Sequence, residues 1–356
     1  MNVFADFHHA GLLYSFYLTL ERRFGWAVYR PIGMEWFERD YFGVAKPYGN
    51  NPETVKQFLS MSPNQKPSDG SPPLNKIKDR NPGLSHYVIR DEYHSYDQKG
   101  MTFDQFINAD IDIIIASIPD HWHTYRRLRD TFKPKAKLVL HAGNMFNELA
   151  DLNSLSDVNL MASTVPLTVP EAWSKVFYYQ EQPVRHFVPA ISTHTISSYA
   201  HVMPNKELFE QYKQALTSDP EDDIVMQSYG AGNADGWKDS LGSLYASMQW
   251  DQAVWHVKPG GDGYGWNWHS AYMLGRPVIT NYSDYKDKLG GILHTDMETG
   301  IDLEKRSFED NVKLIRDCMN DGRFIEMGKQ ARLRWEQHVN YDNEADKLKK
   351  FFENLH

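Results

Sequence analysis

The chain has 356 residues, of which 41% are hydrophobic and 24% are charged. These fractions exclude large-scale disorder, and the length suits two domains of about 150–200 residues each. A net charge of −9 argues against broad nonspecific binding to nucleic acid. The single cysteine, Cys318, excludes an internal disulfide framework and fits a reducing compartment, so we expect a cytoplasmic protein. Every apolar run is shorter than the roughly 18 residues that a transmembrane helix needs.

The first half of the chain alternates predicted strands with predicted helices. A helix follows the first strand, because Leu13, Phe16, Leu20 and Phe24 recur every three or four residues. A second helix is expected over residues 121–131. The segments with strand character are 3–7, 26–30, 112–117, 137–141, 158–162 and 175–179. This alternation is typical of a Rossmann-like α/β domain, which we expect over residues 1–182, with a long Pro- and Gly-rich insertion at 62–85.

The second half repeats the alternation over residues 183–338 without an obvious sequence repeat. Predicted strands lie at 223–227, 253–257 and 276–280. Helical spacing is found at 205–217, 238–249, 324–339 and 345–355. The fold class is therefore α/β, with two domains.

The most specific motif lies between the strands 253–257 and 276–280. It reads Asp262-Gly-Tyr-Gly-Trp-Asn-Trp-His-Ser-Ala-Tyr-Met-Leu-Gly-Arg-Pro-Val-Ile279. Gly263 and Gly265 open a helix that Gly275 closes. A strand, a glycine turn and a helix N-terminus together form a place where backbone N–H groups can hold a phosphate.

This segment resembles the donor-binding segment of the GT-B glycosyltransferases, which use a nucleotide-activated sugar. Asp262 takes the acidic position of their pattern and Tyr264 the aromatic one, and Ser270 stands where the pattern has a second glutamate. The other matching positions are Ala271, Gly275, Pro277, Val278 and Ile279. The resemblance implies two Rossmann-like domains facing a central cleft, a C-terminal helix at 339–356 that returns to the first domain, and no metal requirement.

The resemblance also implies a donor site in the second domain. Asp262 is expected near the sugar hydroxyls, and Ser270 near the ribose, where His269 is a neighbouring alternative. Gly263, Tyr264 and Gly265 would surround the diphosphate. Further candidate donor-binding residues are Lys258, Lys238 and the loop residues Gly230, Gly232 and Asn233. The alternative is a tight βα turn without a ligand and two solvated lysines.

Candidate acceptor-side residues follow two predicted strands of the first domain. His8 and His9 follow the first strand, and Asp120, His121 and His123 follow the strand 112–117. The carboxyl edge of an open α/β sheet is where ligands bind, and a neutral imidazole is a suitable general base near pH 7. The alternatives are helix capping, with Asp120 as an N-cap, and packing.

We therefore expect a glycosyltransferase that moves a sugar from a nucleotide-sugar co-substrate, UDP- or GDP-linked, to an acceptor hydroxyl. No cofactor or metal is expected. The acceptor is a glycan, a small molecule or a modified nucleic acid. The basic segment 125–137 is either a solvated helix face or a patch that tracks phosphates, as in a transferase acting on a hydroxymethylated DNA base. A nucleotide-sugar epimerase and a non-catalytic binding protein with this fold are further alternatives.

Overall fold

The computed structural model describes a defined part of the chain. The described residues are 1–6, 10–31, 89–90, 95–96, 99–101, 103–116, 119–142, 152, 154–162, 169–185, 193–200, 205–219, 223–230, 233–236, 238, 241–258, 265–286 and 288–356. The expected insertion at 62–85 lies outside them.

The first half is built on a seven-stranded sheet in which all neighbouring strands run parallel, in the order β5-β2-β1-β6-β7-β8-β9. Its strands are β1 (Asn2–Asp6), β2 (Ala27–Pro31), β5 (Lys99–Met101), β6 (Ile113–Ala116), β7 (Lys137–Ala142), β8 (Asn159–Ala162) and β9 (Ser174–Phe177). A short antiparallel pair, β3 (Ile89–Arg90) and β4 (Ser95–Tyr96), stands apart.

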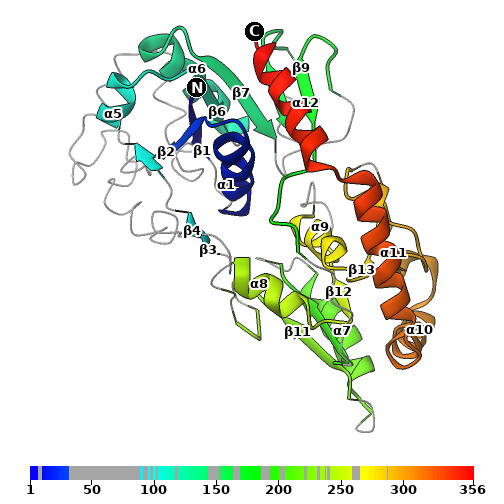
Figure 1. Cartoon of the computed structure of the whole chain (residues 1–356). Coiled ribbons are helices and arrows are strands. Elements are labelled where there is room, and N and C mark those ends of the chain that lie inside the picture. Colours follow the sequence, from blue (N-terminus) through cyan, green and yellow to red (C-terminus); the bar gives the residue numbers. More distant parts are fainter. Residues whose placement is uncertain are drawn as a thin grey trace, which may run out of the picture.

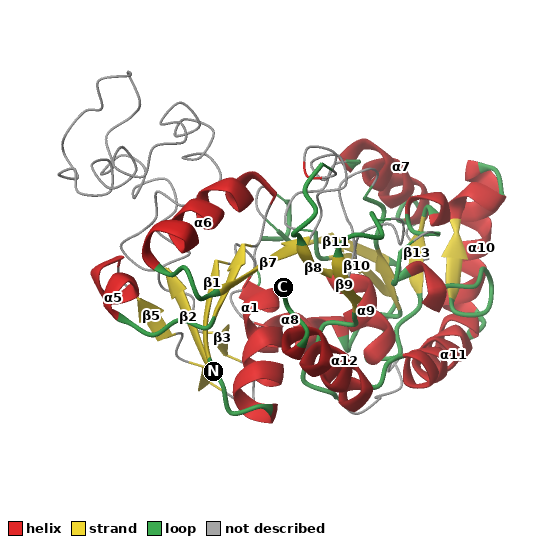
Figure 2. Cartoon of the chain, turned by 90° about the horizontal axis from the view of Figure 1, so that it is seen from above, coloured by secondary structure: helices red, strands yellow, loops and turns green. Residues whose placement is uncertain are grey.

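Helices cover both faces of this sheet (Figure 2). Successive residues of β1 point to opposite faces, so Phe4 packs in one core cluster and Val3 in the other. The helices are α1 (Ala10–Phe16), which continues as the π-helical segment η1 (Tyr17–Arg23), α5 (Phe103–Asn108) and α6 (Pro119–Phe132). Because both faces are covered, the strands read as continuous apolar runs.

The second half has a five-stranded parallel sheet in the order β11-β10-β12-β13-β14. Its strands are β10 (Thr195–Ser198), β11 (Val225–Ser228), β12 (Ala253–Trp255), β13 (Val278–Thr280) and β14 (Gly300–Asp302). Its helices are α7 (Lys206–Leu216), α8 (Leu241–Met248), α9 (Trp266–Met273), α10 (Phe308–Asn320) and α11 (Arg323–His338). Single 3₁₀ turns are η6 (Tyr282–Asp284), η7 (Gly291–Leu293) and η8 (Leu303–Lys305).

The last helix, α12 (Tyr341–Glu353), returns to the first half and lies against β9 (Figure 1). Leu348 and Phe352 of this helix are buried in a first-half core cluster, whereas Tyr341 at its start is buried in a second-half cluster. The chain also crosses from the first half to the second between Tyr178 and Tyr179. Tyr178 is buried in the same first-half cluster, and Tyr179 in the same second-half cluster. The two cores are therefore joined at two neighbouring crossings.

The predicted fold class of two Rossmann-like α/β units is confirmed. The nine predicted strands are present with small shifts at their ends, whereas β5, β10 and β14 were not predicted. One local expectation was wrong: α6 begins at Pro119, so Asp120 lies in the first helical turn and not at the N-cap. Proline suits this first position because its φ is already helical and its missing N–H has no partner there in any helix. Among the described helices, none is both long and apolar enough to cross a membrane.

Candidate functional site

The strand order of each sheet reverses at one place. In the first sheet the reversal lies between β1 and β6, and in the second between β10 and β12. Ligands of open α/β sheets bind beyond the carboxyl ends of the strands at such switch points. Lys258 and the glycine turn follow β12 in the chain, so the predicted donor segment belongs to the second switch point.

Gly265 is the N-cap of α9 and has a left-handed backbone, with φ of +71°. A Cβ at this position would lie 3.1 Å from Trp268 Cβ and 3.3 Å from His256 Nε2. Both the dihedral angle and the close neighbours therefore require glycine. The predicted glycine that opens the helix is confirmed, and Gly275 at φ +66° ends it as expected.

A buried aromatic cluster packs against this turn. The Tyr285 hydroxyl lies 2.7 Å from His256 Nε2, and the Tyr285 and Trp268 rings pack edge to face with centroids 4.5 Å apart. Trp268 and Tyr285 are fully buried, and His256 is 4% exposed. A rigid support of this kind fixes the direction of the first turn of α9, whose N–H groups lack partners within the helix.

At the carboxyl edge of the second sheet, the segments that follow β11 and β12 are hydrogen-bonded to the backbone that follows β10. Asn267 of α9 donates from Nδ2 to the Tyr199 carbonyl at 2.7 Å, and Asn233 of the β11 loop donates to the Ala200 carbonyl at 2.9 Å. Gly230 lies so close to Ala200 that a Cβ would meet its carbonyl oxygen at 2.0 Å. The predicted loop residues Gly230 and Asn233 therefore hold the loops together beside α9.

Lys238 lies on an aromatic stack at the same edge. Its Nζ is 3.7 Å from the centroid of the Tyr229 ring, which stacks on Tyr199 with centroids 5.5 Å apart. A cation held over an aromatic face stays positioned without neutralisation by a carboxylate. The Tyr229 ring thus holds the positive charge of Lys238 in place at the candidate donor site.

Asp251 lies beneath this stack and was not predicted. Tyr199 donates to its Oδ2 at 2.6 Å, and Ser197 donates to its Oδ1 at 2.7 Å. Burial raises the pKa of Asp251 to about 7. Local sequence carries little sign of this burial, because an acidic residue shortly before a buried strand usually marks a solvated strand end.

Ser270 is fully buried. Its hydroxyl lies 2.8 Å from Gln182 Oε1 and 2.9 Å from the Trp266 carbonyl, so it is engaged within the protein. Its neighbour His269 is also buried, and burial lowers the pKa of His269 to about 3. The ribose-binding role of Ser270 remains a prediction, as does the phosphate-binding role of Lys258, which is partly exposed after β12.

In the first half, the structure places the backbone of Asp120, His121 and His123 in the first turns of α6, after β6. Their side chains lie outside the described part, as do His8 and His9, and in the second half Gly232, Asp262, Gly263 and Tyr264. Asp6, the last residue of β1, is a buried carboxylate that was not predicted. Burial and its hydrogen bond to Asp6 raise the pKa of Tyr125 well above its usual value.

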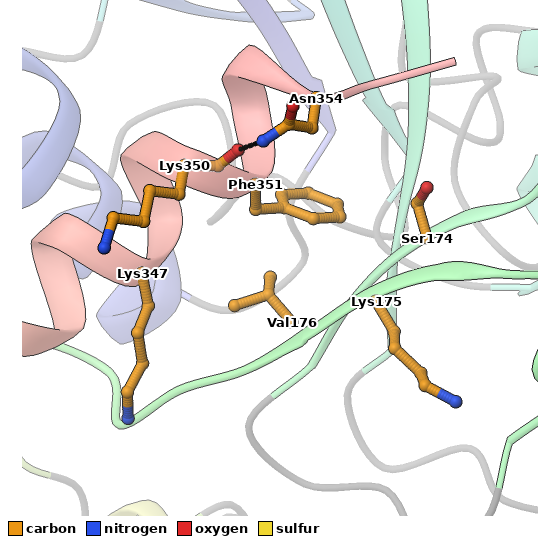
Figure 3. Close-up of a pocket in the computed structure, with 7 residues that line it drawn as sticks. All are labelled: Ser174, Lys175, Val176, Lys347, Lys350, Phe351 and Asn354. Carbon is orange, nitrogen blue, oxygen red and sulfur yellow. Dashed lines mark hydrogen bonds between the residues drawn. The ribbon is translucent and has the colours of Figure 1, made fainter.

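A shallow hollow of about 390 Å³ lies between β9 and α12, away from both switch points (Figure 3). Val176 and Phe351 contribute its apolar part. The ammonium groups of Lys175, Lys347 and Lys350 point in different directions, so they do not converge on one ligand. Among the described residues there is also no group of three side chains suited to a metal ion. The carboxyl edge of the second sheet is therefore the candidate site.

No family model matches the chain, and no curated protein matches it in sequence. Solved structures do match. A TarM mutant from S. aureus, in complex with fondaparinux, alpha-GlcNAc-glycerol and UDP, has a TM-score of 0.61 and 10% identity over 99% of both chains. A second TarM structure, at TM-score 0.53 and 13% identity, covers 67% of this chain and 54% of its own.

Two further structures are similar over the whole chain. Anabaena HepE in complex with UDP and glucose has a TM-score of 0.60 and 10% identity over 100% of both chains. The pneumococcal O-GlcNAc transferase GtfA in complex with UDP and GlcNAc has a TM-score of 0.60 and 10% identity over 100% of this chain and 99% of its own. The expected GT-B architecture of two Rossmann-like domains is confirmed, and at these identities the likeness establishes the fold.

Proposed function

We propose that the protein is a glycosyltransferase that moves a sugar from a nucleotide-sugar donor to an acceptor hydroxyl. The observation that carries this proposal is the left-handed Gly265 cap of α9 at the second switch point, on a buried aromatic support. A helix N-terminus of this kind favours a diphosphate. Three of the four similar structures are bound to UDP, and one of these three is an O-GlcNAc transferase, which supports this choice over the epimerase, the DNA-modifying enzyme and the binding protein.

The chemistry needs positive charge where the diphosphate leaves. Backbone N–H groups of the turn, Lys258 and Lys238 would supply it, and no metal ion is required in this proposal. Asp262 would orient the sugar hydroxyls. On the acceptor side, the proposed general bases are His8, His9, Asp120, His121 or His123, because each follows a strand at the first switch point.

We propose UDP as the nucleotide, since three of the similar structures carry it, with GDP as the alternative. A calorimetric titration with UDP, GDP, ADP and CDP, each beside a sugar conjugate, tests this directly. We expect UDP to bind without added metal and to bind more weakly to Lys258→Met. A folded protein that binds none of these nucleotides would exclude the proposed function.

The sugar-contacting role of Asp262 is tested separately. In Asp262→Ala we expect UDP to bind as in the unmodified protein, while the extra affinity given by the sugar conjugate is lost. Release of UDP from a bound UDP-sugar, measured with panels of glycans, small alcohols and hydroxymethylated DNA, then identifies the acceptor class by the increase in rate.

A further inference from the structure

The chain crosses between the halves twice, and adjacent residues at the first crossing are bound by opposite halves. Glu181 accepts a hydrogen bond at 2.7 Å from Arg23 Nη2 of the first half. The next residue, Gln182, is bound by the second half, because Ser270 of α9 lies 2.8 Å from its Oε1. One peptide bond therefore separates the attachment to one half from the attachment to the other.

The second crossing has the same arrangement. Asp342 accepts from Arg23 Nη1 at 2.5 Å, whereas the preceding residue, Tyr341, has its hydroxyl 3.0 Å from His269 Nε2 of α9. Arg23 thus contacts both crossings from the first half, and α9 contacts both from the second. We call this set the hinge clasp, and its members are Arg23, Glu181, Gln182, His269, Ser270, Tyr341 and Asp342.

Within the hinge clasp, the contact of Arg23 with Asp342 and the contact of Gln182 with Ser270 differ in how exposed their side chains are. The Arg23 and Asp342 side chains are 32% and 82% exposed, so their ion pair can exchange with water at little cost. Gln182, by contrast, is 1% exposed and Ser270 is fully buried. A buried hydrogen bond is costly to break without replacement. Glu181 at the first crossing is only 12% exposed and also accepts from Thr19 Oγ1 at 2.7 Å, so the weakly held contact is the one between Arg23 and Asp342 at the second crossing.

The side-chain amide of Gln182 makes its described hydrogen bonds through one atom. Its Oε1 accepts from Ser270 and, at 3.2 Å, from the Tyr245 hydroxyl. Its Nε2 is buried and has no hydrogen-bond partner among the described residues. Within the described part of the chain, the side chain of Gln182 is therefore attached to the second half through Oε1.

We infer that Gln182 is a positioning residue that sets the angle of α9, and with it the Gly265 turn, relative to the first half. His269 and Ser270 lie about one helical turn after Gly265, so a change at Gln182 moves the turn almost directly. The further link, from this angle to occupancy of the turn by a nucleotide, rests on the proposed function. The positioning role itself does not.

The test measures the distance between the halves with two spin labels, one at Lys135→Cys and one at Glu210→Cys. Both positions are exposed, and the native Cys318 is fully buried. Without any ligand, Gln182→Leu is expected to shift or broaden the distance distribution, because Leu fills the space but releases Ser270 and Tyr245. Tyr245→Phe is expected to shift it in the same direction by a smaller amount.

Gln252→Leu is the matched control, because Gln252 is 4% exposed in the same half and lies outside the hinge clasp. It should leave the distribution unchanged. If Gln182→Leu and Tyr245→Phe are folded, as judged by thermal melting, and both match the unmodified protein, the positioning role is excluded. Should Gln182→Leu fail to fold, Tyr245→Phe alone decides.

A second arm adds UDP and separates the two proposals. We expect UDP to shift the distribution in the unmodified protein and to produce less than half of that shift in Gln182→Leu. If UDP binds both proteins and shifts them equally, the coupling is excluded while the proposed function stands. If UDP and the other nucleotides bind neither protein, the proposed function fails, and the ligand-free comparison still decides the role of Gln182.

Discussion

Asp251 and Lys238 lie on opposite sides of one tyrosine pair. The ammonium group of Lys238 lies over the ring of Tyr229, and Tyr229 stacks on Tyr199. The Tyr199 hydroxyl in turn donates a hydrogen bond to Asp251. The buried carboxylate thus holds the tyrosine pair over which the half-buried ammonium group of Lys238 lies. A titratable group in the core is in this way connected to the surface where the diphosphate is proposed to bind.

Stability should depend on pH through Asp251. Its pKa is raised from 3.8 to about 7 in the folded protein, so the stabilisation it gives relative to Asp251→Asn is complete below about pH 4 and is lost as the pH rises to about 7. We expect the difference in melting temperature between the two proteins to change across this range and to be constant above it. A difference that is the same at pH 4.5 and pH 8 would contradict the raised pKa.

This comparison is needed because buried histidines act in the opposite direction. Burial lowers the pKa values of His141 and His269 to about 3, so their contribution is complete above about pH 6.5 and is lost in acid. Both histidines are present in Asp251→Asn and in the unmodified protein, so their effect cancels in the difference.

Gly265→Ala should reduce both stability and nucleotide binding. Its left-handed φ costs an alanine about 1–2 kcal/mol, and the new Cβ would also press on Trp268 and His256. Gly322→Ala is the matched control, because Gly322 caps α11 at φ +80° with nothing within 4 Å of its Cβ position. Urea unfolding and calorimetry with UDP measure the two effects. If both variants lose the same stability and bind UDP normally, the Gly265 turn has no special role in nucleotide binding.

Lys238→Met should weaken UDP binding about tenfold, the effect of losing one charge-assisted contact of roughly 1.5 kcal/mol. Lys238→Arg should retain most of the affinity, since an arginine also lies well over a tyrosine ring. Lys329→Met, on the exposed face of α11 beside Glu326, removes the same charge outside the turn and should have no effect. Affinity that stays the same in Lys238→Met would leave Lys238 with a packing role only.

Phe352→Ala in the returning helix should destabilise the first half by about 3–5 kcal/mol, because it empties a core position packed against Trp26. Leu355→Ala, three residues later and only partly buried, should cost less. Unfolding followed by tryptophan fluorescence gives both values. Two equal and small losses would show that α12 does not complete the first core.

The sequence was most informative where local patterns are strong. Apolar runs such as 112–117 predicted the buried parallel strands, and the glycines at 265 and 275 predicted both ends of α9. The short strand β10 was missed because Thr195-Ile-Ser-Ser198 is largely polar, and its last three residues are buried only through their neighbours in the sheet. Strand order, which locates the switch points, is a long-range property that no local pattern contains.

The candidate site was predicted unevenly for the same reason. Gly265 and Lys238 belong to segments with recognisable composition, whereas Asp251 is set apart only by side chains 52 and 54 residues away. Ser270 was singled out by its place in a motif, but its contact with Gln182 joins residues 88 positions apart. Burial and pairing over such distances become visible only in the folded chain.

The return of α12 to the first half has a consequence for synthesis. The second half is one continuous segment enclosed by the first, and apart from Tyr341 its core residues are all made before α12. The core of the first half includes Leu348, Phe351 and Phe352, which are made after the second half. A stop codon just before α12 would therefore leave the core of the first half incomplete, whereas nearly all of the second-half core would still be made.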